Sequence, residues 1–467
     1  MNFKEIHIGI LGMGEAGMSA ARWLYNQGAD LVCMDDRPPE EWQRDFLSWC
    51  KQSGIGNICV SRLRKLPKDL DLLVVSPGVP PHHRVVSYAR EKGVAVVGEL
   101  YLAACFWKGP LVGITGTNGK TTTTLLTAHL LNEAGIPVIK AGNISPPLFD
   151  LLHLDNGKTC GVLEISSFQL EYFPDVPVLD LARPVFKVAV CLNVAPDHID
   201  RHGSIEKYKK VKERLFSFQG NDSFGVLGPG AEDFEVKART VFLKDIRIDK
   251  REGPILVIPV DGKKMRLDVS RWTLRGKHNI ENLASAAVSA SALGVAAQQI
   301  EMALSDFRAP CHRMEEFGVF DGVIYIDDSK ATNLHAVTTG LRALPDQHVV
   351  LIAGGRAKGE DLSDFGRIVL SLNNGGGPRI KGVILVGEAA KEMALGFEGF
   401  LQNICVIHGL NGDKVMEEAA RKARAMAEAG DLVVLSPACA SFDMFSSYKK
   451  RGMAFRKAVL KVCSQKQ

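Results

Sequence analysis

Residues 111–124 read LVGITGTNGKTTTT, and this stretch decides the fold class. Leu111–Ile114 is an apolar run of strand length, and a helical pattern over Thr121–Ala134 follows the polar loop. Similar strand-length runs alternate with helical patterns along the whole chain, which is typical of strand–helix units and largely parallel sheets. We therefore expect an α/β protein.

The loop inside this stretch is a variant of the common phosphate-binding loop. That motif would need glycine where this chain has Ile114, and the glycines here are instead Gly113, Gly116 and Gly119. Backbone N–H groups and a helix N-terminus still favour phosphate, Lys120 adds a positive charge, and a threonine hydroxyl can reach magnesium. A loop with no nucleotide is the alternative, and the placement of glycine, lysine and hydroxyl argues against it.

The expected strands on either side of this loop divide the chain into three domains. The chain has 467 residues, enough for about three domains. We expect a Rossmann-like N-terminal domain over 1–107, a P-loop ATPase-like central domain over 108–308 and a Rossmann-like C-terminal domain over 309–467. The main expected strands are Ile6–Leu11, Leu31–Met34, Leu72–Ser76, Val94–Val97, Thr159–Ile165, Val188–Asn193, Ile255–Val260, Met265–Val269, Val323–Asp327, Val349–Ala353, Gly382–Val386, Ile404–His408 and Leu432–Leu435.

Composition excludes several classes of protein. The net charge of +4 gives no electrostatic footprint for nucleic acid, so no nucleic-acid partner is expected. No apolar run approaches the roughly 18 residues of a membrane span, and the N-terminus lacks the features of a signal peptide. The ten cysteines form no CxxC pair, which indicates reduced thiols without a metal. We expect a cytoplasmic protein.

A second glycine-rich turn lies near the N-terminus. Gly12, Gly14 and Gly17 have GxGxxG spacing after a strand, and Asp35 and Asp36 end the next strand. This context indicates a turn that holds a diphosphate, with an acidic residue for a ribose hydroxyl. The alternative is that the glycines only permit tight strand-to-helix packing.

Two polar stretches follow expected strands of the central domain. Glu164 ends one strand, where a magnesium-directed acid belongs, and the alternative is a solvated Glu164 beside a helix capped by Ser166 or Ser167. His198 lies in the polar stretch 193–202, where it could be a metal ligand, a base or part of a solvated loop. Farther on, Lys212 lies in a basic helical stretch whose spacing alone predicts a solvated charged face.

Loops of the C-terminal domain also follow strands, so they can converge at one sheet edge. His312 and Arg313 open the domain, and the loops read DSKATN at 328–333, GGRAK at 354–358 and SPACASFD at 436–443. Lysine, arginine and hydroxyl groups there suit an anionic substrate. Cys439 is expected to be a small buried residue, not a nucleophile.

Taken together, these motifs resemble one family, the Mur ligases of peptidoglycan synthesis, over essentially the whole chain in order. Within that family the pairing of DSKATN with SPACASFD is most similar to the ligases that add D-glutamate. The motifs are GxGxxG at 12–17, TGTNGKTT at 115–122, EISSFQ at 164–169, NxxxDHxDRH at 193–202, HNxxN at 278–282, HR at 312–313, DSKATN and SPACASFD.

The resemblance implies a role for each matching residue, and it replaces the solvated reading of Lys212 with a carbamylated lysine. Catalytic residues would be Lys120, Glu164, His198 and Lys212, and the ligands of two Mg²⁺ ions would be Thr121, Glu164, His198 and the carbamate, derived from CO₂, on Lys212. The ATP site would comprise Gly116, Thr117, Asn118, Gly119, Lys120, Thr121, Thr122, Asn279, Asn282, Arg313 and Asp328. The UDP-sugar site would comprise Gly14, Glu15, Ala16, Asp35, Asp36, Arg37, Ser76, Gly78, Asn143 and Ser166. The D-glutamate site would comprise Lys330, Thr332, Lys358, Ser441, Phe442 and Tyr448.

The implied activity is ATP-dependent ligation of D-glutamate to UDP-N-acetylmuramoyl-L-alanine by a monomer, through an acyl phosphate. Two positions depart from the family pattern: Ser145 stands where glycine is usual, and Asp327 stands where asparagine is usual. The alternatives are a related ligase that adds L-alanine, a diamino acid or glutamate on folate, a nicotinamide oxidoreductase, and a nucleotide-binding regulator without turnover.

Overall fold

The computed structural model describes residues 3–4, 6–62, 69–251, 253–308, 310–344, 346–359, 361–374, 378–397, 399 and 403–464. The chain forms two compact units. Unit 1 comprises residues 1–194, 206–271 and 282–305, and unit 2 comprises residues 195–205, 272–281 and 306–467. Residue 309, at an expected domain boundary, lies outside the described residues.

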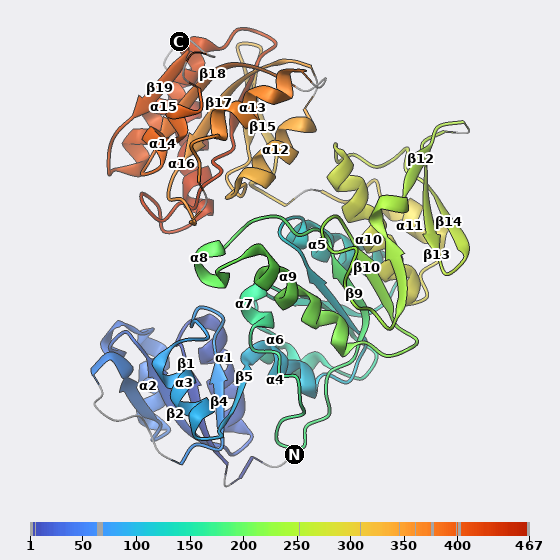
Figure 1. Cartoon of the computed structure of the whole chain (residues 1–467), viewed down its shortest axis with the longest axis vertical. Coiled ribbons are helices and arrows are strands. Elements are labelled where there is room, and N and C mark those ends of the chain that lie inside the picture. The colour runs from blue at the N-terminus through green and yellow to red at the C-terminus, as the bar shows by residue number, and fades with distance from the viewer. Residues whose placement is uncertain are drawn as a thin grey trace. The chain divides into compact units, whose positions relative to one another are not determined.

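The N-terminal part of unit 1 is a parallel sheet in the order β3-β2-β1-β4-β5, drawn in blue in Figure 1. Each strand carries apolar side chains on both faces, as a sheet covered by helices on both sides requires. The strands are β1 (His7–Leu11), β2 (Asp30–Asp35), β3 (Gly56–Cys59), β4 (Leu72–Val75) and β5 (Ala95–Gly98). The helices are α1 (Glu15–Asn26), α2 (Arg44–Gln52), α3 (Arg84–Glu91) and α4 (Glu99–Phe106).

The central part of unit 1 holds a second parallel sheet and a small antiparallel one. The parallel order is β11-β10-β9-β6-β8-β7, and the small sheet is β12-β13-β14. The strands are β6 (Leu111–Thr115), β7 (Val138–Gly142), β8 (Cys160–Glu164), β9 (Phe186–Cys191), β10 (Phe224–Leu227), β11 (Arg239–Phe242), β12 (Arg247–Asp249), β13 (Ile255–Val260) and β14 (Lys263–Asp268). The helices are α5 (Lys120–Glu133), α6 (Leu148–Leu151), α7 (Ser167–Leu170), α9 (Ile205–Glu213), α10 (Lys277–Ala292) and α11 (Ala297–Ala303).

One apolar core joins the two parallel sheets of unit 1. Tyr101 of α4, which follows the N-terminal sheet, packs edge-on against Phe173 and Phe218 of the central part. A polar contact supports the same junction, because the Ser19 hydroxyl donates to Asp150 at 2.6 Å. Burial of large aromatic rings is the dominant source of stability at such a contact. The two sheets therefore belong to one packed body.

Unit 2 is built on a mostly parallel sheet in the order β15-β16-β20-β17-β18-β19, in which only the β15–β16 pair is antiparallel. Helices α12, α13 and α14 cover one face and α15 and α16 cover the other. The strands are β15 (Glu315–Phe320), β16 (Val323–Asp327), β17 (His348–Gly354), β18 (Arg379–Val386), β19 (Ile404–Ile407) and β20 (Leu432–Leu435). The helices are α8 (Ile199–His202), α12 (Leu334–Arg342), α13 (Phe365–Leu370), α14 (Ala390–Leu395), α15 (Gly412–Met426) and α16 (Tyr448–Ser464).

The prediction of an α/β protein with largely parallel sheets is confirmed. Among the described residues, no helix combines the length and apolar character that crossing a membrane demands. Parallel sheets place the loops after their strands at one edge, which is where the polar stretches of this chain were expected.

Candidate active site

The phosphate loop joins β6 to α5 and adopts the backbone that its glycines permit. Gly116 and Gly119 have φ angles of 140° and 86°, which favour glycine. Lys120 Nζ donates to the carbonyls of Gly116 and Thr117 at 2.7 and 2.8 Å, so its ammonium group folds over the loop. The backbone N–H of Asn118 donates to Asn193 Oδ1 at 2.9 Å, which ties the loop to the end of β9. The loop therefore holds a lysine and a set of backbone N–H groups.

Asn282 of α10 also supports this loop. Its side chain is buried, and Oδ1 accepts a hydrogen bond from Thr123 Oγ at 3.1 Å. A Cβ atom at Gly119 would lie 2.5 Å from Asn282 Oδ1, so any larger residue would displace the asparagine. Thr121 and Thr122, both expected to bind ATP, lie in the first turn of α5.

Glu164 ends β8, the strand next to the strand that leads into the phosphate loop. It pairs in register with Ile114, and its side chain is only 3% exposed. Oε1 accepts from Asn143 Nδ2 at 2.7 Å, whereas Oε2 is buried without a hydrogen-bond partner. A buried carboxylate oxygen without a donor costs free energy unless a proton or cation completes it. The donor set therefore fits a hard cation such as Mg²⁺.

The alternative interpretation of this stretch was a solvated Glu164 beside a helix capped by Ser166 or Ser167, and only the cap is found. Ser166 does cap α7, because its hydroxyl accepts from the backbone N–H of Gln169 and the Gln169 side chain accepts from the Ser166 N–H. Glu164, however, is buried and not solvated. Ser166 caps a helix and lies near the sheet edge at the same time, so capping does not argue against a binding role.

Lys212 of α9 corrects the solvated face that spacing alone predicts. The side chain is 1% exposed, and Nζ donates to the carbonyl of Gly116 in the phosphate loop at 3.0 Å. Tyr208 lies below it, with its ring centre 4.4 Å from Nζ and its hydroxyl 3.2 Å from Thr117 Oγ. Burial of a charged lysine costs free energy, so a buried lysine that contacts the phosphate loop is a candidate functional residue.

The N-terminal glycine loop contains one glycine for packing and one that the fold does not need. A Cβ atom at Gly17 would lie 2.0 Å from the carbonyl oxygen of Gly12, so Gly17 serves the close packing of helix on strand. Nothing lies within 4 Å of the Cβ position of Gly14. Both the packing and the ligand interpretation of the motif therefore have support, at different residues.

The two acidic residues at the end of β2, Asp35 and Asp36, also differ in role. Asp35 is buried, and its carboxylate accepts from the backbone N–H of Met13 at 2.6 Å and from Arg37, so it holds the glycine loop in place. Burial would raise the pKa of Asp35, but the bonds from Arg37 and Met13 lower it below its usual value. Asp36 and Arg37 are more exposed and face solvent beside the loop.

Further bonds hold other residues expected at the UDP-sugar site to neighbouring parts of unit 1. Ser76 Oγ donates to the carbonyl of Gly12 at 2.7 Å, which fixes the turn that contains Gly78. The hydroxyl of Ser145, where the family usually has glycine, donates to Glu15 at 2.5 Å. Ala16 follows Glu15 in the first turn of α1, and Asn143 follows β7. All residues of this set lie in unit 1, and the bond between Glu15 and Ser145 connects the N-terminal members to the turn that contains Asn143.

In unit 2, Asp197, which lies in the polar stretch 193–202 but outside the expected sets of site residues, joins several predicted residues. Its buried carboxylate accepts from Lys358 at 3.2 Å and from Asn333 at 2.9 Å, and Lys358 also donates to Thr332 Oγ at 3.1 Å. Burial opposes the charge of Asp197, but Lys358, His198 and Asn333 lower its pKa. His198 Nε2 lies 3.7 Å from the same carboxylate.

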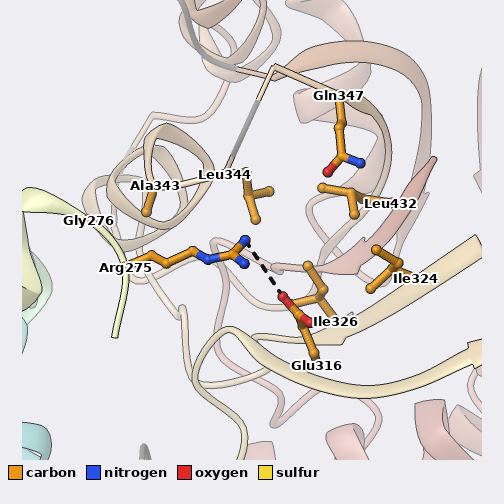
Figure 2. Close-up of a pocket in the computed structure, with 9 residues that line it drawn as sticks. All are labelled: Arg275, Gly276, Glu316, Ile324, Ile326, Ala343, Leu344, Gln347 and Leu432. Carbon is orange, nitrogen blue, oxygen red and sulfur yellow. Dashed lines mark ion pairs between the residues drawn. The ribbon is translucent and has the colours of Figure 1, made fainter. Parts of the chain in front are cut away.

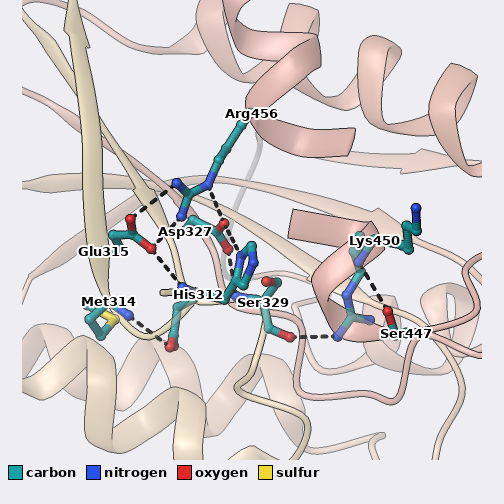
Figure 3. A network of polar contacts seen from close by, with 10 residues as sticks. His312, Met314, Glu315, Asp327, Ser329, Ser447, Lys450 and Arg456 are labelled. Atoms are coloured by element: carbon teal, nitrogen blue, oxygen red, sulfur yellow. Dashed lines mark hydrogen bonds and ion pairs between the residues drawn. The ribbon is translucent and has the colours of Figure 1, made fainter. Parts of the chain in front are cut away.

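Asp328 and Asp327, at the end of β16, have opposite electrostatic environments. Burial raises the pKa of Asp328 to about 7, against hydrogen bonds from Ser436 and the backbone of Met314 and the charge of Arg313. Burial would also raise the pKa of Asp327, yet Arg456, Ser329 and His312 lower it. Figure 3 shows His312 and Arg456 converging on Asp327, with Nδ1 and Nε at 2.7 and 2.8 Å. The acidic residue that departs from the family pattern is therefore neutralised locally.

Arg451 of α16 connects the three loops of the C-terminal sheet edge. Its guanidinium is 1% exposed and donates to the carbonyls of Ser329, Gly354, Cys439 and Ala440 at 3.0, 3.4, 2.9 and 3.2 Å. Burial lowers its pKa to about 10. Cys439 is fully buried, as expected.

The other residues expected to bind D-glutamate lie on or beside these loops. Lys330 Nζ lies 4.3 Å from the ring centre of Tyr448, which fixes the lysine by a cation–π contact. Ser441 is buried, whereas the Phe442 ring is 65% exposed. Asn279 donates to the carbonyl of Arg275 at 2.7 Å at the start of α10. These residues, with Arg313 and Asp328, belong to unit 2, and the phosphate loop belongs to unit 1.

A separate cavity of about 880 Å³ lies in unit 2, and it contains none of the predicted site residues. It is lined by Ile324 and Leu432, at the amino-terminal ends of β16 and β20, and by Ala343 and Leu344 after α12 (Figure 2). Arg275 and Glu316 form a loose ion pair of 4.0 Å across it. This cavity is at the edge of the sheet opposite the DSKATN loop.

Comparison with known protein families agrees with this architecture. Three family models match: "Mur ligase MurD-like, N-terminal domain" at residues 6–98, "Mur ligase middle domain" at 114–290 and "Mur ligase, glutamate ligase domain" at 312–439. Among curated relatives, the protein named UDP-N-acetylmuramoylalanine--D-glutamate ligase from Koribacter versatilis is 35% identical and the alignment covers all of both chains. The relative of the same name from Geotalea daltonii is 36% identical over 98% of each chain.

Solved structures show the same fold at lower identity. A pseudomurein peptide ligase type C from Methanothermus fervidus superposes with a TM-score of 0.57 at 18% identity, covering 98% of this chain and 100% of that one. MurF ligase from Thermotoga maritima, solved with ADP, gives 0.57 at 16% identity over 99% and 96%. Because the family models match most of the chain and the curated relatives match it from end to end, the chain belongs to the Mur ligase family.

Proposed function

We propose that this protein is an ATP-dependent ligase that joins D-glutamate to UDP-N-acetylmuramoyl-L-alanine in peptidoglycan precursor synthesis. The observation that carries the proposal is the phosphate loop with two buried ionisable side chains, Glu164 and Lys212, beside it. Relatives that match the whole chain have names with the same two substrates. All substrates are cytoplasmic metabolites in this proposal, and the enzyme acts there as a monomer.

The reaction has two steps. The alanine carboxylate of the UDP-sugar attacks the γ-phosphorus of ATP, ADP leaves, and an acyl phosphate forms. The amino group of D-glutamate then attacks the acyl carbon, and inorganic phosphate leaves with the bond electrons. Phosphoryl transfer needs positioning and charge stabilisation more than covalent chemistry, so the protein's task is to hold both ends of the reaction.

Residues of the phosphate loop hold the ATP phosphates in this proposal. Lys120 releases the carbonyls of Gly116 and Thr117 and pairs with phosphate, which turns a contact within the loop into a contact with substrate. Backbone N–H groups from Gly119 to Thr122 add hydrogen bonds at the helix N-terminus. Asn279, Asn282, Arg313 and Asp328 hold the nucleoside and phosphates.

Two Mg²⁺ ions would be held by Thr121 with Glu164, and by His198 with Lys212 after carbamylation. When bound, the metal lowers the charge on the transferring phosphoryl group. The unpartnered Oε2 of Glu164 supports the first site, and the burial of Lys212 against the phosphate loop supports the second.

Specificity for the two organic substrates is assigned to two groups of residues. The UDP-sugar is held by Gly14, Glu15, Ala16, Asp35, Asp36, Arg37, Ser76, Gly78, Asn143 and Ser166. Lys330, Thr332, Lys358, Ser441, Phe442 and Tyr448 hold D-glutamate, with the Lys330 and Lys358 ammonium groups available for its carboxylates.

The test is phosphate release from ATP with Mg²⁺ and UDP-N-acetylmuramoyl-L-alanine, compared among D-glutamate, L-glutamate, L-alanine, diaminopimelate and no amino acid. We expect release that depends on D-glutamate. Release with another amino acid would keep the ligase and overturn the substrate. No release with any of them would overturn the enzyme itself.

A further inference from the structure

We propose that Glu99, acting through Gln169, is a positioning residue that sets the Ser166 turn for the UDP-sugar. The proposal rests on the proposed function for the identity of the substrate. It adds a residue that lies outside every set assigned above and that connects the N-terminal sheet to the central sheet within unit 1.

Glu99 is the first residue of α4, directly after β5, and only 4% of its surface is exposed. Its Oε1 accepts a hydrogen bond from Gln169 Nε2 at 3.3 Å. Its Oε2 is buried with no hydrogen-bond partner. A buried carboxyl group with one free oxygen is expensive to keep, which calls for a reason beyond packing.

Two contacts fix which way the Gln169 amide faces: the Ser166 backbone N–H, which needs an acceptor, and Glu99, which accepts from the amide NH₂ group. With its NH₂ group on Glu99, the amide presents Oε1 to Ser166, where it accepts from the backbone N–H at 3.0 Å and from the hydroxyl at 3.1 Å. The Ser166 hydroxyl in turn accepts from the Gln169 N–H at 3.2 Å. The orientation of the Ser166 hydroxyl therefore depends on a bond that Glu99 anchors.

The same junction reaches the other turn assigned to the UDP-sugar. The backbone N–H of Gly98 donates to the carbonyl of Tyr172 at 3.0 Å, and the Tyr172 hydroxyl donates to the carbonyl of Val79 at 2.9 Å. Val79 belongs to the turn with Ser76 and Gly78. Glu99, the first residue of α4, thus follows directly on the backbone bond that joins β5 to the segment after α7, and α4 and α7 are in contact (both are labelled in Figure 1).

Burial gives this contact a pH dependence. It raises the pKa of Glu99 to about 7, against hydrogen bonds from the Leu100 backbone and Gln169. Carboxylates on the neighbouring helices α1 and α6 are engaged elsewhere, Glu15 with Ser145 and Asp150 with Ser19. Below neutral pH the group is uncharged and its bond to Gln169 persists. Above it, the Gln169 bond favours the charge, but the charge on Oε2 has no donor and burial opposes it, so entry of water beside Glu99 becomes favourable and loosens the Ser166 turn.

The experiment measures the KM for the UDP-sugar and for ATP at pH 6, 7 and 8, for the wild type, Glu99→Gln, Glu99→Leu and the exposed control Glu91→Gln. If the ionised form does not bind, a pKa of about 7 predicts roughly a tenfold rise in the wild-type KM for the UDP-sugar by pH 8. Glu99→Gln should keep the low KM at every pH, because an amide copies the neutral acid. Glu99→Leu should raise it at every pH, because Gln169 loses its acceptor.

Two results would overturn the proposal: a Glu99→Gln profile that rises like the wild type, or Glu99→Leu behaving like Glu99→Gln. The KM for ATP and the control should follow the wild type throughout. Hydrogen exchange of amides 166–170, corrected for intrinsic rates, supplies a readout without turnover. Protection there should fall from pH 6 to pH 8 in the wild type and not in Glu99→Gln. If ligation fails while this difference appears, the positioning role stands and only the substrate assignment falls.

Discussion

Single buried charges show where this molecule departs from a simple apolar interior. Lys212, Glu164, Asp327 and Arg451 are each at most 3% exposed, yet each has a partner that explains its place, either a loop carbonyl, an amide or an opposite charge. Buried charges are costly unless paired, so their removal has effects that depend on what each one contacts.

Lys212→Ala should abolish ligation, because the proposed carbamate is removed from the phosphate loop. A small carboxylate such as acetate or formate should restore part of the activity by occupying the vacated space, whereas bicarbonate alone should not. Lys120→Ala is the matched control: activity is lost there too, but a carboxylate should not restore it. Phosphate release across a carboxylate titration provides the measurement, and activity indifferent to both the substitution and the carboxylate would contradict the carbamate.

Asp327→Asn should destabilise unit 2 by about 1–3 kcal/mol, since Arg456 and His312 lose a charged acceptor inside the protein. Because the pKa of Asp327 is lowered, its stabilising charge is present above the usual carboxyl pKa and is lost as the pH falls through the folded value. The difference between variant and wild type should therefore shrink towards pH 3. Urea unfolding at pH 7 and pH 3 tests this, and an equal difference at both pH values would exclude the charge as its cause.

Elements meet at the carboxyl edge of the C-terminal sheet, and Arg451 at the start of α16 is where three of their loops converge. The carboxyl ends of β16, β17 and β20 place the carbonyls of Ser329, Gly354, Cys439 and Ala440 around one guanidinium. A helix that begins at a binding edge can thus organise loops far away in the chain.

Arg451→Met should lower the free energy of unfolding by more than about 3 kcal/mol, because several buried carbonyls lose their donor although the side-chain volume is nearly kept. Arg451→Lys should recover part of that loss, since one ammonium group reaches fewer carbonyls. Thermal unfolding of both variants, with the exposed Arg367→Met as control, gives the comparison. A Met variant as stable as the wild type would show that the loops hold themselves.

Elements also show which parts of the fold follow from local pattern. The strands β13, β16 and β20 match the apolar runs Ile255–Val260, Val323–Asp327 and Leu432–Leu435 residue for residue, because β-branched and aliphatic residues dominate these stretches. The apolar runs do not predict β3, β7, β10, β11, β12 or β15. All of these except β10 are edge strands, and β3 and β15 contain glycine and polar residues, which weaken the signal.

The site residues also divide into those that a local sequence pattern indicates and those that it does not. Residues in local motifs, such as Lys120 and Glu164, could be selected from spacing and strand ends. The contacts of Asp197, a member of the motif at 193–202, and of Glu99 could not, because their partners Lys358 and Gln169 lie 161 and 70 residues away. Only the fold brings those pairs together, so no local pattern predicts them.

At the scale of the whole molecule, the chain passes between its two units several times, so unit 2 is not one continuous segment. Residues 195–205 and 272–281 belong to unit 2 although they lie between segments of unit 1. Asp197 in the first segment bonds to Lys358 and Asn333, and Trp272 in the second stacks on Phe307 with ring centres 6.0 Å apart.

A fragment of residues 306–467 should therefore be less stable than the same unit in the full chain, although it contains the whole C-terminal sheet. It lacks the carboxylate for Lys358 and the partner ring of Phe307. Comparing its thermal midpoint with that of the full chain, and with a Lys358→Met full-length variant, separates the missing contacts from the cut itself. A fragment with the full-chain midpoint would show that the two inserted segments add nothing to unit 2.

Gly14 has a consequence that reaches beyond stability. Because empty space surrounds its missing side chain, alanine there should fold like the wild type and fail only when the substrate arrives. Gly17→Ala is the opposite case, because it collides with the backbone of Gly12 and should lower the melting temperature. A matched pair of this kind separates selection for a ligand from selection for a fold. Gly14→Ala should raise the KM for the UDP-sugar several-fold at an unchanged melting temperature. Cells with this variant would contain a full-length, well-folded enzyme that binds one of its substrates weakly.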